Sequence, residues 1–291
     1  MLSHLKKKKI ELEKTLFCFE NTGVYTYPLS INLSQFELDY WIVPAIEIKR
    51  SKGISRGKND KTNAKDIGWY SIRNIDKLKL SSIAEKEIQQ LKLLFTEREK
   101  VMKTLLIFGT TKENKDFITN DIFKVVAIIN LKTIKHLKIS LKELETKMKE
   151  IIKNNFELKQ QFDLIKSVPG VGQQSALYFI IATKGFKAFD NSRKFACYSG
   201  TAPFDSSSGS SVRGGTKVSH MADKKMKLLL QMWALAAIKY DPQLKEYYNK
   251  KKSEGKNSML VFNNIRCKII DRVFSVINRK TPYINTYKFA R

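Results

Sequence analysis

The spacing of apolar and polar residues changes twice along the chain, and the first part, residues 1–80, has the pattern of an α/β domain. Two short apolar runs, residues 14–20 and 38–44, are each followed by a segment with helical spacing. The order strand, helix, strand, helix predicts a parallel sheet. Two strands are too few for a complete sheet of this kind, so we expect that the domain is truncated at its N-terminus.

The second part, residues 81–161, has helical spacing and no strand pattern. Apolar residues recur at steps of three and four on both sides of a polar break at 109–116, and Lys and Glu occupy the outer positions. This pattern predicts an amphipathic helical hairpin, here a coiled-coil linker. We interpret it as a spacer or a dimerisation arm and not as a catalytic part.

The third part, residues 162–291, is predicted to be mostly helical, so the fold class expected for the whole chain is α/β plus mostly α. Near its start, residues 167–176 have the form of a helix-hairpin-helix turn, in which Gly170, Val171 and Gly172 connect two helices. Amides at the N-terminus of the second helix can hold a phosphate without reading base sequence. A plain turn between two core helices is the alternative.

A polar loop at residues 203–217 interrupts the helical part and contains five serines and three glycines. This composition is typical of a flexible linker. Chemistry is the other interpretation, because a serine can attack a phosphoryl group when cations neutralise the phosphoryl oxygens. Arg213 and Lys217 lie close in sequence to Ser206–Ser208, so a covalent phosphoserine is chemically reasonable.

Two carboxylates in the first part are candidates for metal binding. Glu20 ends the first apolar run, and Asp60 lies just before a helical segment. Carboxylates at a strand end and a helix start, brought together across a parallel sheet, are how an RNase-H-like fold holds Mg²⁺ (or Mn²⁺) for phosphodiester chemistry. Acidic residues are also common at such positions because they favour the helix dipole, so the pair alone does not identify a metal site.

Charge indicates the partner of the chain. Lys and Arg outnumber Asp and Glu by 54 to 28, giving a formal net charge of +26. Such a chain favours a polyanion, because phosphates that pair with its cations release condensed counterions. No apolar run is long enough to span a membrane and no secretion signal is recognisable, so DNA or RNA is favoured over lipid and no membrane partner is expected.

Cysteine and histidine are too few and too scattered for several other classes of site. The chain has three of each, far apart in the sequence. We therefore expect reduced thiols of a cytoplasmic protein, and neither disulfides nor a zinc site. Catalysis by a Ser-His-Asp triad is improbable for the same reason.

The order of these segments resembles the transposases of the bacterial insertion sequence one-ten family, also called DEDD/serine transposases or bridge-RNA-guided recombinases. The resemblance runs from Lys14 to the C-terminus through FCFENTGVY, RGKNDKTNAKDI, SVPGVG, FACYSGTAPFDSSSG and GTKVSHMADKKMKLLL. It implies an RNase-H/RuvC-like domain whose four acidic residues bind Mg²⁺, a coiled coil, and a C-terminal domain whose serine becomes joined to DNA. It also implies a homo-oligomer and a structured guide RNA that selects both DNA partners.

Carried across residue by residue, the resemblance implies that Glu20 takes the second acidic position and Asp60 the third. Ser208 is the expected nucleophile, with Ser207 as the reserve. The strand with the first acidic residue would precede the chain, and the fourth position is Asn63, which offers a neutral oxygen and no charge. Asp66 is a doubtful substitute, because a spacing of six turns it away from Asp60 on a helix.

The resulting expectation is a truncated transposase that would cut and rejoin DNA through Ser208. Glu20, Asp60 and Mg²⁺ would position the scissile phosphate, while the turn at 170–172 and basic residues such as Arg213 and Lys217 would hold nucleic acid. Because half of the acidic set is missing, we expect activity to be impaired or lost, and a remnant that only binds DNA or RNA is the alternative. A Holliday-junction nuclease is disfavoured, since it needs all four carboxylates.

Overall fold

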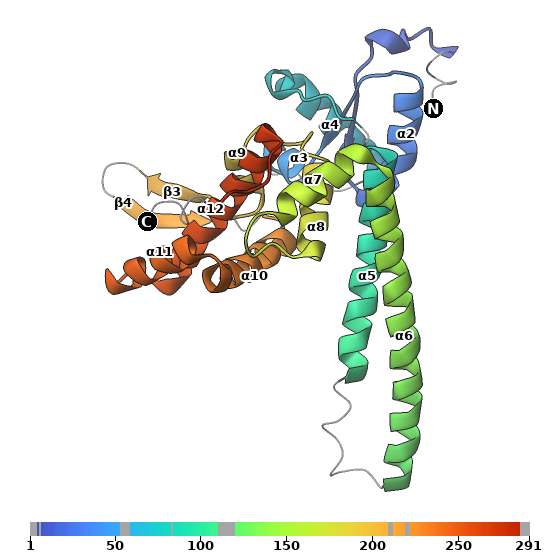
Figure 1. The fold of residues 1–291 in the computed structure, drawn as a ribbon. Helices are drawn as coiled ribbons and strands as arrows, with labels where there is room; N and C mark the ends of the chain where they lie inside the picture. Colours follow the sequence, from blue (N-terminus) through green and yellow to red (C-terminus); the bar gives the residue numbers. More distant parts are fainter. Residues whose placement is uncertain are drawn as a thin grey trace. The chain divides into compact units, whose positions relative to one another are not determined.

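The computed structural model describes residues 5, 7–52, 59–82, 84–109, 120–208, 212–218 and 222–285. Contacts within the chain divide it into two compact units, Met1–Ala84 and Glu85–Arg291. Most of the described residues are helical (Figure 1). No helix in these ranges is long and apolar enough to cross a bilayer.

The first unit is built on a parallel pair of strands, as the sequence predicts. In this pair Phe17 lies opposite Tyr40 and Glu20 opposite Val43. Parallel strands need a crossover connection, which here is a helix. The elements of the unit are η1 (Leu12–Lys14), β1 (Phe17–Glu20), η2 (Gly23–Thr26), α2 (Tyr27–Gln35), β2 (Tyr40–Val43), α3 (Ala45–Ser51), α4 (Asp60–Arg73) and η3 (Ile75–Lys77).

Both faces of this small sheet are covered, because alternate strand residues enter two separate apolar clusters. Tyr40 packs with Leu33 of α2, whereas Trp41 and Val43 pack with Tyr70 of α4. Because both faces of each strand are covered, the sequences of β1 before its last residue and of β2 are continuous apolar runs without a polar face.

The second unit begins with two long helices, α5 (Lys86–Gly109) and α6 (Asn120–Asn154). They pack against each other over most of the length of α5, as Figure 1 shows. Arg98 of α5 bonds Glu145 of α6 through Nε at 2.8 Å. The helical hairpin expected for this part of the chain is therefore present.

A helical body with an aromatic centre forms the rest of the second unit. Phe179 stacks on Trp233 and contacts Phe195 and Phe274, so four segments distant in sequence meet at one buried ring. The elements are α7 (Phe156–Lys166), α8 (Gln173–Thr183), α9 (Ser192–Tyr198), β3 (Pro203–Ser208), β4 (Val212–Val218), α10 (Lys224–Tyr240), α11 (Pro242–Ser253) and α12 (Ser258–Arg279).

The serine-rich segment is a β-hairpin, which corrects the prediction of a flexible linker. β3 and β4 pair antiparallel, with Ser206 opposite Gly214, Ser207 opposite Arg213 and Ser208 opposite Val212. Antiparallel strands can be joined by a short turn, and their ladder is made by the backbone, so a Ser/Gly composition does not prevent pairing. Composition alone could not reveal the register between two such strands.

Candidate nucleic-acid interface

Glu20 and Asp60 both belong to the first unit. Glu20 is the half-exposed last residue of β1, and Asp60 is the exposed first residue of α4, which packs against β1. Asn59 and Thr62 cap α4 reciprocally: Thr62 N donates to Asn59 Oδ1 at 2.8 Å, and Asn59 N donates to Thr62 Oγ1 at 3.2 Å. The Asp60 carboxylate therefore lies in the first turn, where the helix dipole favours negative charge.

A lysine ammonium is bound at the position that the resemblance assigns to the fourth acidic residue. Lys52, at the end of α3, donates to Asn63 Oδ1 at 3.4 Å, and its Nζ lies 2.7 Å from Asp66 Oδ2. Asp66 is six residues after Asp60 but only three after Asn63. The side chains of Asn63 and Asp66 therefore share one face of α4. Their oxygens are therefore engaged by a cation that belongs to the protein itself.

The residues present do not fit a complete metal site. Of the acidic positions that the resemblance assigns within this sequence, Glu20 and Asp60 are carboxylates, and the oxygen of Asn63 is shared with Lys52. Over the described ranges, no group of three or more His, Cys, Asp or Glu side chains is placed to hold a metal ion. A hard divalent cation prefers six or more oxygen ligands with compensating charge, which these residues do not supply.

The turn between α7 and α8 is held against α10 by Gly170. This residue has φ +86°, and a Cβ at its position would lie 2.8 Å from Ala237 N in α10. Gly172, by contrast, has φ −83° and open space around it. Of the two glycines, only Gly170 therefore has a conformation and surroundings that require glycine, because any residue can adopt the conformation of Gly172.

The N-terminus of α8 has no capping side chain. Its N-cap is Gly172, and both Gly172 and Gln173 are exposed. The neighbouring helices of the unit are each capped by a side chain, namely that of Asn155, Asn191, Asp223, Asp241 or Asn257. The first amides of α8 are thus not covered by a side-chain cap, and the phosphate-binding role of the turn stays a prediction.

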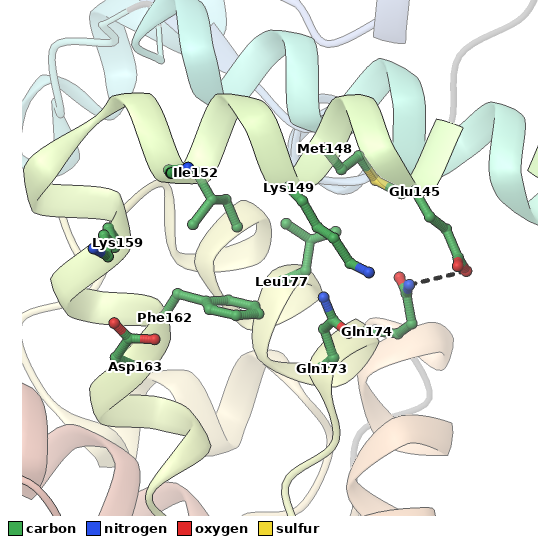
Figure 2. A pocket seen from close by; sticks show the side chains of 11 residues that line it. Glu145, Met148, Lys149, Ile152, Lys159, Phe162, Asp163, Gln173, Gln174 and Leu177 are labelled. Atoms are coloured by element: carbon green, nitrogen blue, oxygen red, sulfur yellow. Dashed lines mark hydrogen bonds between the residues drawn. The ribbon is translucent and has the colours of Figure 1, made fainter. Parts of the chain in front are cut away.

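A cavity of about 230 Å³ lies directly beside this helix start, between α6, α7 and α8 (Figure 2). Its apolar lining is contributed by Met148, Ile152, Phe162 and Leu177. Lys149, Lys153 and Lys159 also line it, together with Gln173 and Gln174. Sequence analysis missed this cavity, because its residues come from three helices and no local pattern connects them.

The serine hairpin is anchored at both of its ends. At its far end, the Asp223 backbone N donates to Tyr198 O at 2.9 Å. The Asp223 Oδ2 accepts from the hydroxyls of Tyr198, at 2.7 Å, and Tyr178, at 2.9 Å. At its near end, Asn263 Nδ2 donates to Thr201 O at 2.7 Å. The two ends of the hairpin segment, Thr201 and Asp223, are therefore held by residues of α8, α9 and α12.

Asp223 keeps its two tyrosine partners in the neutral, donating form. Burial raises the pKa of the Tyr178 and Tyr198 hydroxyls, and the nearby Asp223 carboxylate raises both pKa values further. The same carboxylate caps α10 by accepting from Met226 N at 2.9 Å. The position of Asp223 just before an apolar helical run is a capping signal that sequence reasoning could have used.

The expected site residues of the hairpin are close in its backbone register. Ser207 and Arg213 are cross-strand neighbours, and Lys217 lies opposite Phe204. Ser208 is the last residue of β3. The side chains of these residues lie outside the described part of the structure. Glu20, Asp60 and Asn63 belong to the first unit and the hairpin to the second.

Comparison with known proteins identifies the region that contains the turn and the hairpin. Residues 162–249 match the family described as Transposase IS116/IS110/IS902. Residues 162–249 are thus a domain of this transposase family. The resemblance found from the sequence is thereby confirmed, and the matched residues include the C-terminal part of α7, all of α8, α9 and α10, and most of α11.

Individual relatives agree with the transposase family. The chain is 22% identical over 151 residues to the pilin gene-inverting protein of Moraxella bovis, which covers 52% of this chain and 47% of that protein. It is 31% identical over 107 residues to the insertion element IS900 uncharacterized 42 kDa protein of Mycobacterium paratuberculosis, covering 36% of this chain and 27% of the relative. The chain thus spans about half the length, or less, of these relatives.

We predict that the two glycines of the turn differ in what they tolerate. Gly170→Ala should lower the free energy of unfolding by about 2 kcal/mol or more, since it adds a clash with α10 and a positive φ for a residue with a side chain. Gly172→Ala is the matched control and should lower the free energy of unfolding by no more than about 1 kcal/mol. Urea unfolding of both variants measures the difference, and equal losses would contradict the contact with α10.

Proposed function

We propose that the chain is a DNA transposase or recombinase that cuts and rejoins strands through Ser208. The observation that carries the proposal is the position of the serine hairpin within the region that matches the transposase family. We divide the chain accordingly into a partial RNase-H/RuvC-like domain at 1–80, a coiled-coil linker at 81–161 and a transposase domain at 162–291. The Moraxella relatives are named pilin gene-inverting protein, and inversion of a gene is also a reaction that cuts and rejoins DNA.

In the proposed reaction, Ser208 Oγ forms a bond to phosphorus while the bond from phosphorus to the leaving strand's oxygen breaks. The leaving oxygen takes up the proton that serine loses, so one phosphoester replaces another and no oxidant or reductant is consumed. A hydroxyl of a second strand then reverses the step and joins the new ends. Arg213, the cross-strand neighbour of Ser207, and Lys217 supply positive charge for the phosphate oxygens.

Nucleic-acid binding rests on two features of the second unit. The uncapped amides at the start of α8 can hold a backbone phosphate, and the net charge of +26 adds attraction that does not depend on sequence. DNA is the proposed substrate, and a structured guide RNA is the proposed second partner by family resemblance. Glu20 and Asp60 are the two carboxylates that remain for Mg²⁺ or Mn²⁺ in the first unit.

One observation favours a second candidate, a remnant that binds DNA or RNA without recombining it. The oxygens of Asn63 and Asp66 are engaged by Lys52, and the described residues hold no group of three metal-ligating side chains. A family member whose strand exchange depends on four carboxylates would lose that reaction when these oxygens are engaged by a lysine. It would still bind nucleic acid through its net positive charge and the turn at 170–172.

The helical arm is the part that we propose to join copies into a homo-oligomer. Apolar side chains on α6 are exposed at helical spacing, among them Ile122, Val125 and Ile129, and Leu106 of α5 is also exposed. Apolar residues repeated at this spacing are typical of a surface that a partner helix covers.

We predict that Ser208→Ala abolishes a covalent protein–DNA adduct. The chain would be incubated with the DNA that flanks its own coding sequence and with RNA transcribed from those flanks, and the adduct would be resolved on a denaturing gel. Ser206→Ala is the matched control and should leave the adduct intact. An adduct that persists in Ser208→Ala would move the nucleophile to Ser207, and no adduct from the unaltered chain would favour the remnant.

Affinity for DNA should fall steeply with salt, because most of the binding comes from neutralised phosphates. Between about 50 and about 200 mM salt the association constant should drop at least about tenfold, which corresponds to two or more phosphate contacts. Fluorescence anisotropy with a labelled duplex measures this slope. An affinity independent of salt would contradict the role given to the positive charge.

Negative charge introduced on the apolar stripe of the arm should reduce the oligomeric state. Val125→Glu together with Ile129→Glu places carboxylates on the apolar stripe of α6, and sedimentation velocity should show smaller species than for the unaltered chain. Lys142→Glu, at an exposed position of the same helix, is the control and should not change the sedimentation. Identical sedimentation of the double variant and the control would remove the arm from the interface.

A further inference from the structure

The cavity between α6, α7 and α8 has no role in the strand-exchange reaction above, yet it adjoins the proposed phosphate site. We propose that it receives a single unstacked base of a bound nucleic acid, while lysines around it hold the phosphates on either side of that base. The inference rests on the proposed binding of nucleic acid by this chain. It adds a site that distinguishes an unpaired nucleotide from a paired one.

The apolar lining suits a flat heterocycle. Met148, Ile152 and Leu177 are nearly buried, and the Phe162 side chain reaches into the same space in Figure 2. Aromatic side chains are the usual surfaces on which proteins stack unpaired bases. The volume of about 230 Å³ is several times the roughly 30 Å³ that one water molecule takes up in the liquid, so there is room for one base ring system.

One acceptor atom in the polar lining has no hydrogen-bond partner, and a base can supply the donor. Gln174 Nε2 donates to Glu145 Oε1 at 3.1 Å, and Figure 2 shows this bond at one side of the cavity. The Oε1 of Gln174 is buried and has no partner among the described residues. A buried acceptor without a donor costs about 1–3 kcal/mol. The exocyclic amino group of adenine or cytosine is a donor of the required kind.

The charges around the cavity favour a nucleotide over an apolar side chain of another protein. Lys149, Lys153 and Lys159 contribute three ammonium groups. Of the two carboxylates in the lining, Glu145 is paired with Arg98, which leaves the carboxylate of Asp163 as the counter-charge. The excess of positive charge fits the phosphates that precede and follow an inserted base.

The position of the cavity at the start of α8 gives a single path for the strand. Gln173 lines the cavity and is also the first residue of α8, whose amides are uncapped. One phosphate can therefore lie at the helix N-terminus while the neighbouring base enters the cavity. The turn and the cavity then act as one site.

The test compares two duplexes of equal length and charge that differ at one unpaired position, with adenine in the first and an abasic sugar in the second. The full chain should bind the adenine duplex about 5- to 100-fold more tightly, which is the range expected for stacking one base. Equal affinity for the two duplexes would overturn the base site while leaving the proposed function in place. Failure to bind either duplex would overturn the proposed function as well.

Two variants connect this preference to the cavity. Phe162→Leu removes the ring but keeps an apolar side chain, and it should bring the ratio of the two affinities close to one. Gln173→Glu places a carboxylate beside the lysines, where it should weaken binding of both duplexes at least about fivefold. The helix dipole favours this carboxylate in the first turn of α8, so the loss does not depend on unfolding.

Matched controls carry the same chemical changes away from the cavity. Phe156→Leu alters an aromatic residue of α7 that is 81% exposed, and Gln160→Glu adds a charge at an exposed position of the same helix. Both should behave as the unaltered chain. A Phe162→Leu variant that unfolds at the normal temperature and keeps the preference for adenine would overturn the proposal. The proposal would also be overturned if Phe162→Leu changed the oligomeric state and nothing else, because the cavity would then be occupied by a protein side chain.

Discussion

The close contact of Gly170 with α10 is the constraint on which the second unit depends. Because no side chain stands between the turn and Ala237, α7 and α8 can both pack against the helical body while α8 begins immediately after Gly172. The first turns of α8 carry Gln173, Gln174 and Leu177, all of which line the cavity. A shift of the turn by the width of a methyl group would therefore move the open amides and the cavity together.

The serine hairpin is held at both of its ends by the segments that flank it. Asp223 joins the far end to Tyr198 by a backbone and a side-chain hydrogen bond, and Asn263 fixes the near end through Thr201. Anchors of this kind hold the two ends of the hairpin in place, as the proposed role of Ser208 as a nucleophile would require.

Sequence reasoning succeeded where the interacting residues are close in sequence. The parallel strands, the helical hairpin and the turn at Gly170 follow from local spacing and from the needs of one backbone conformation. It failed where contacts join distant segments. Lys52 at the end of α3 donates to Asn63 of α4, and Phe162 lines a cavity with residues of α6 and α8. Pairing of β3 with β4 is equally invisible in composition, since the ladder is formed by backbone groups that all residues share.

Affinity and discrimination come from different parts of such a protein. A charge of +26 attracts any nucleic acid, and a helix N-terminus holds a phosphate regardless of the base attached to it, so neither feature selects a site. A largely apolar cavity that receives one base would respond to whether a base is free to leave its stack, which is a property of structure and not of sequence. Folded RNA and distorted DNA offer such bases and regular duplex does not. A chain with this cavity would therefore select the substrate's shape first, and base pairing with a guide strand could supply the sequence.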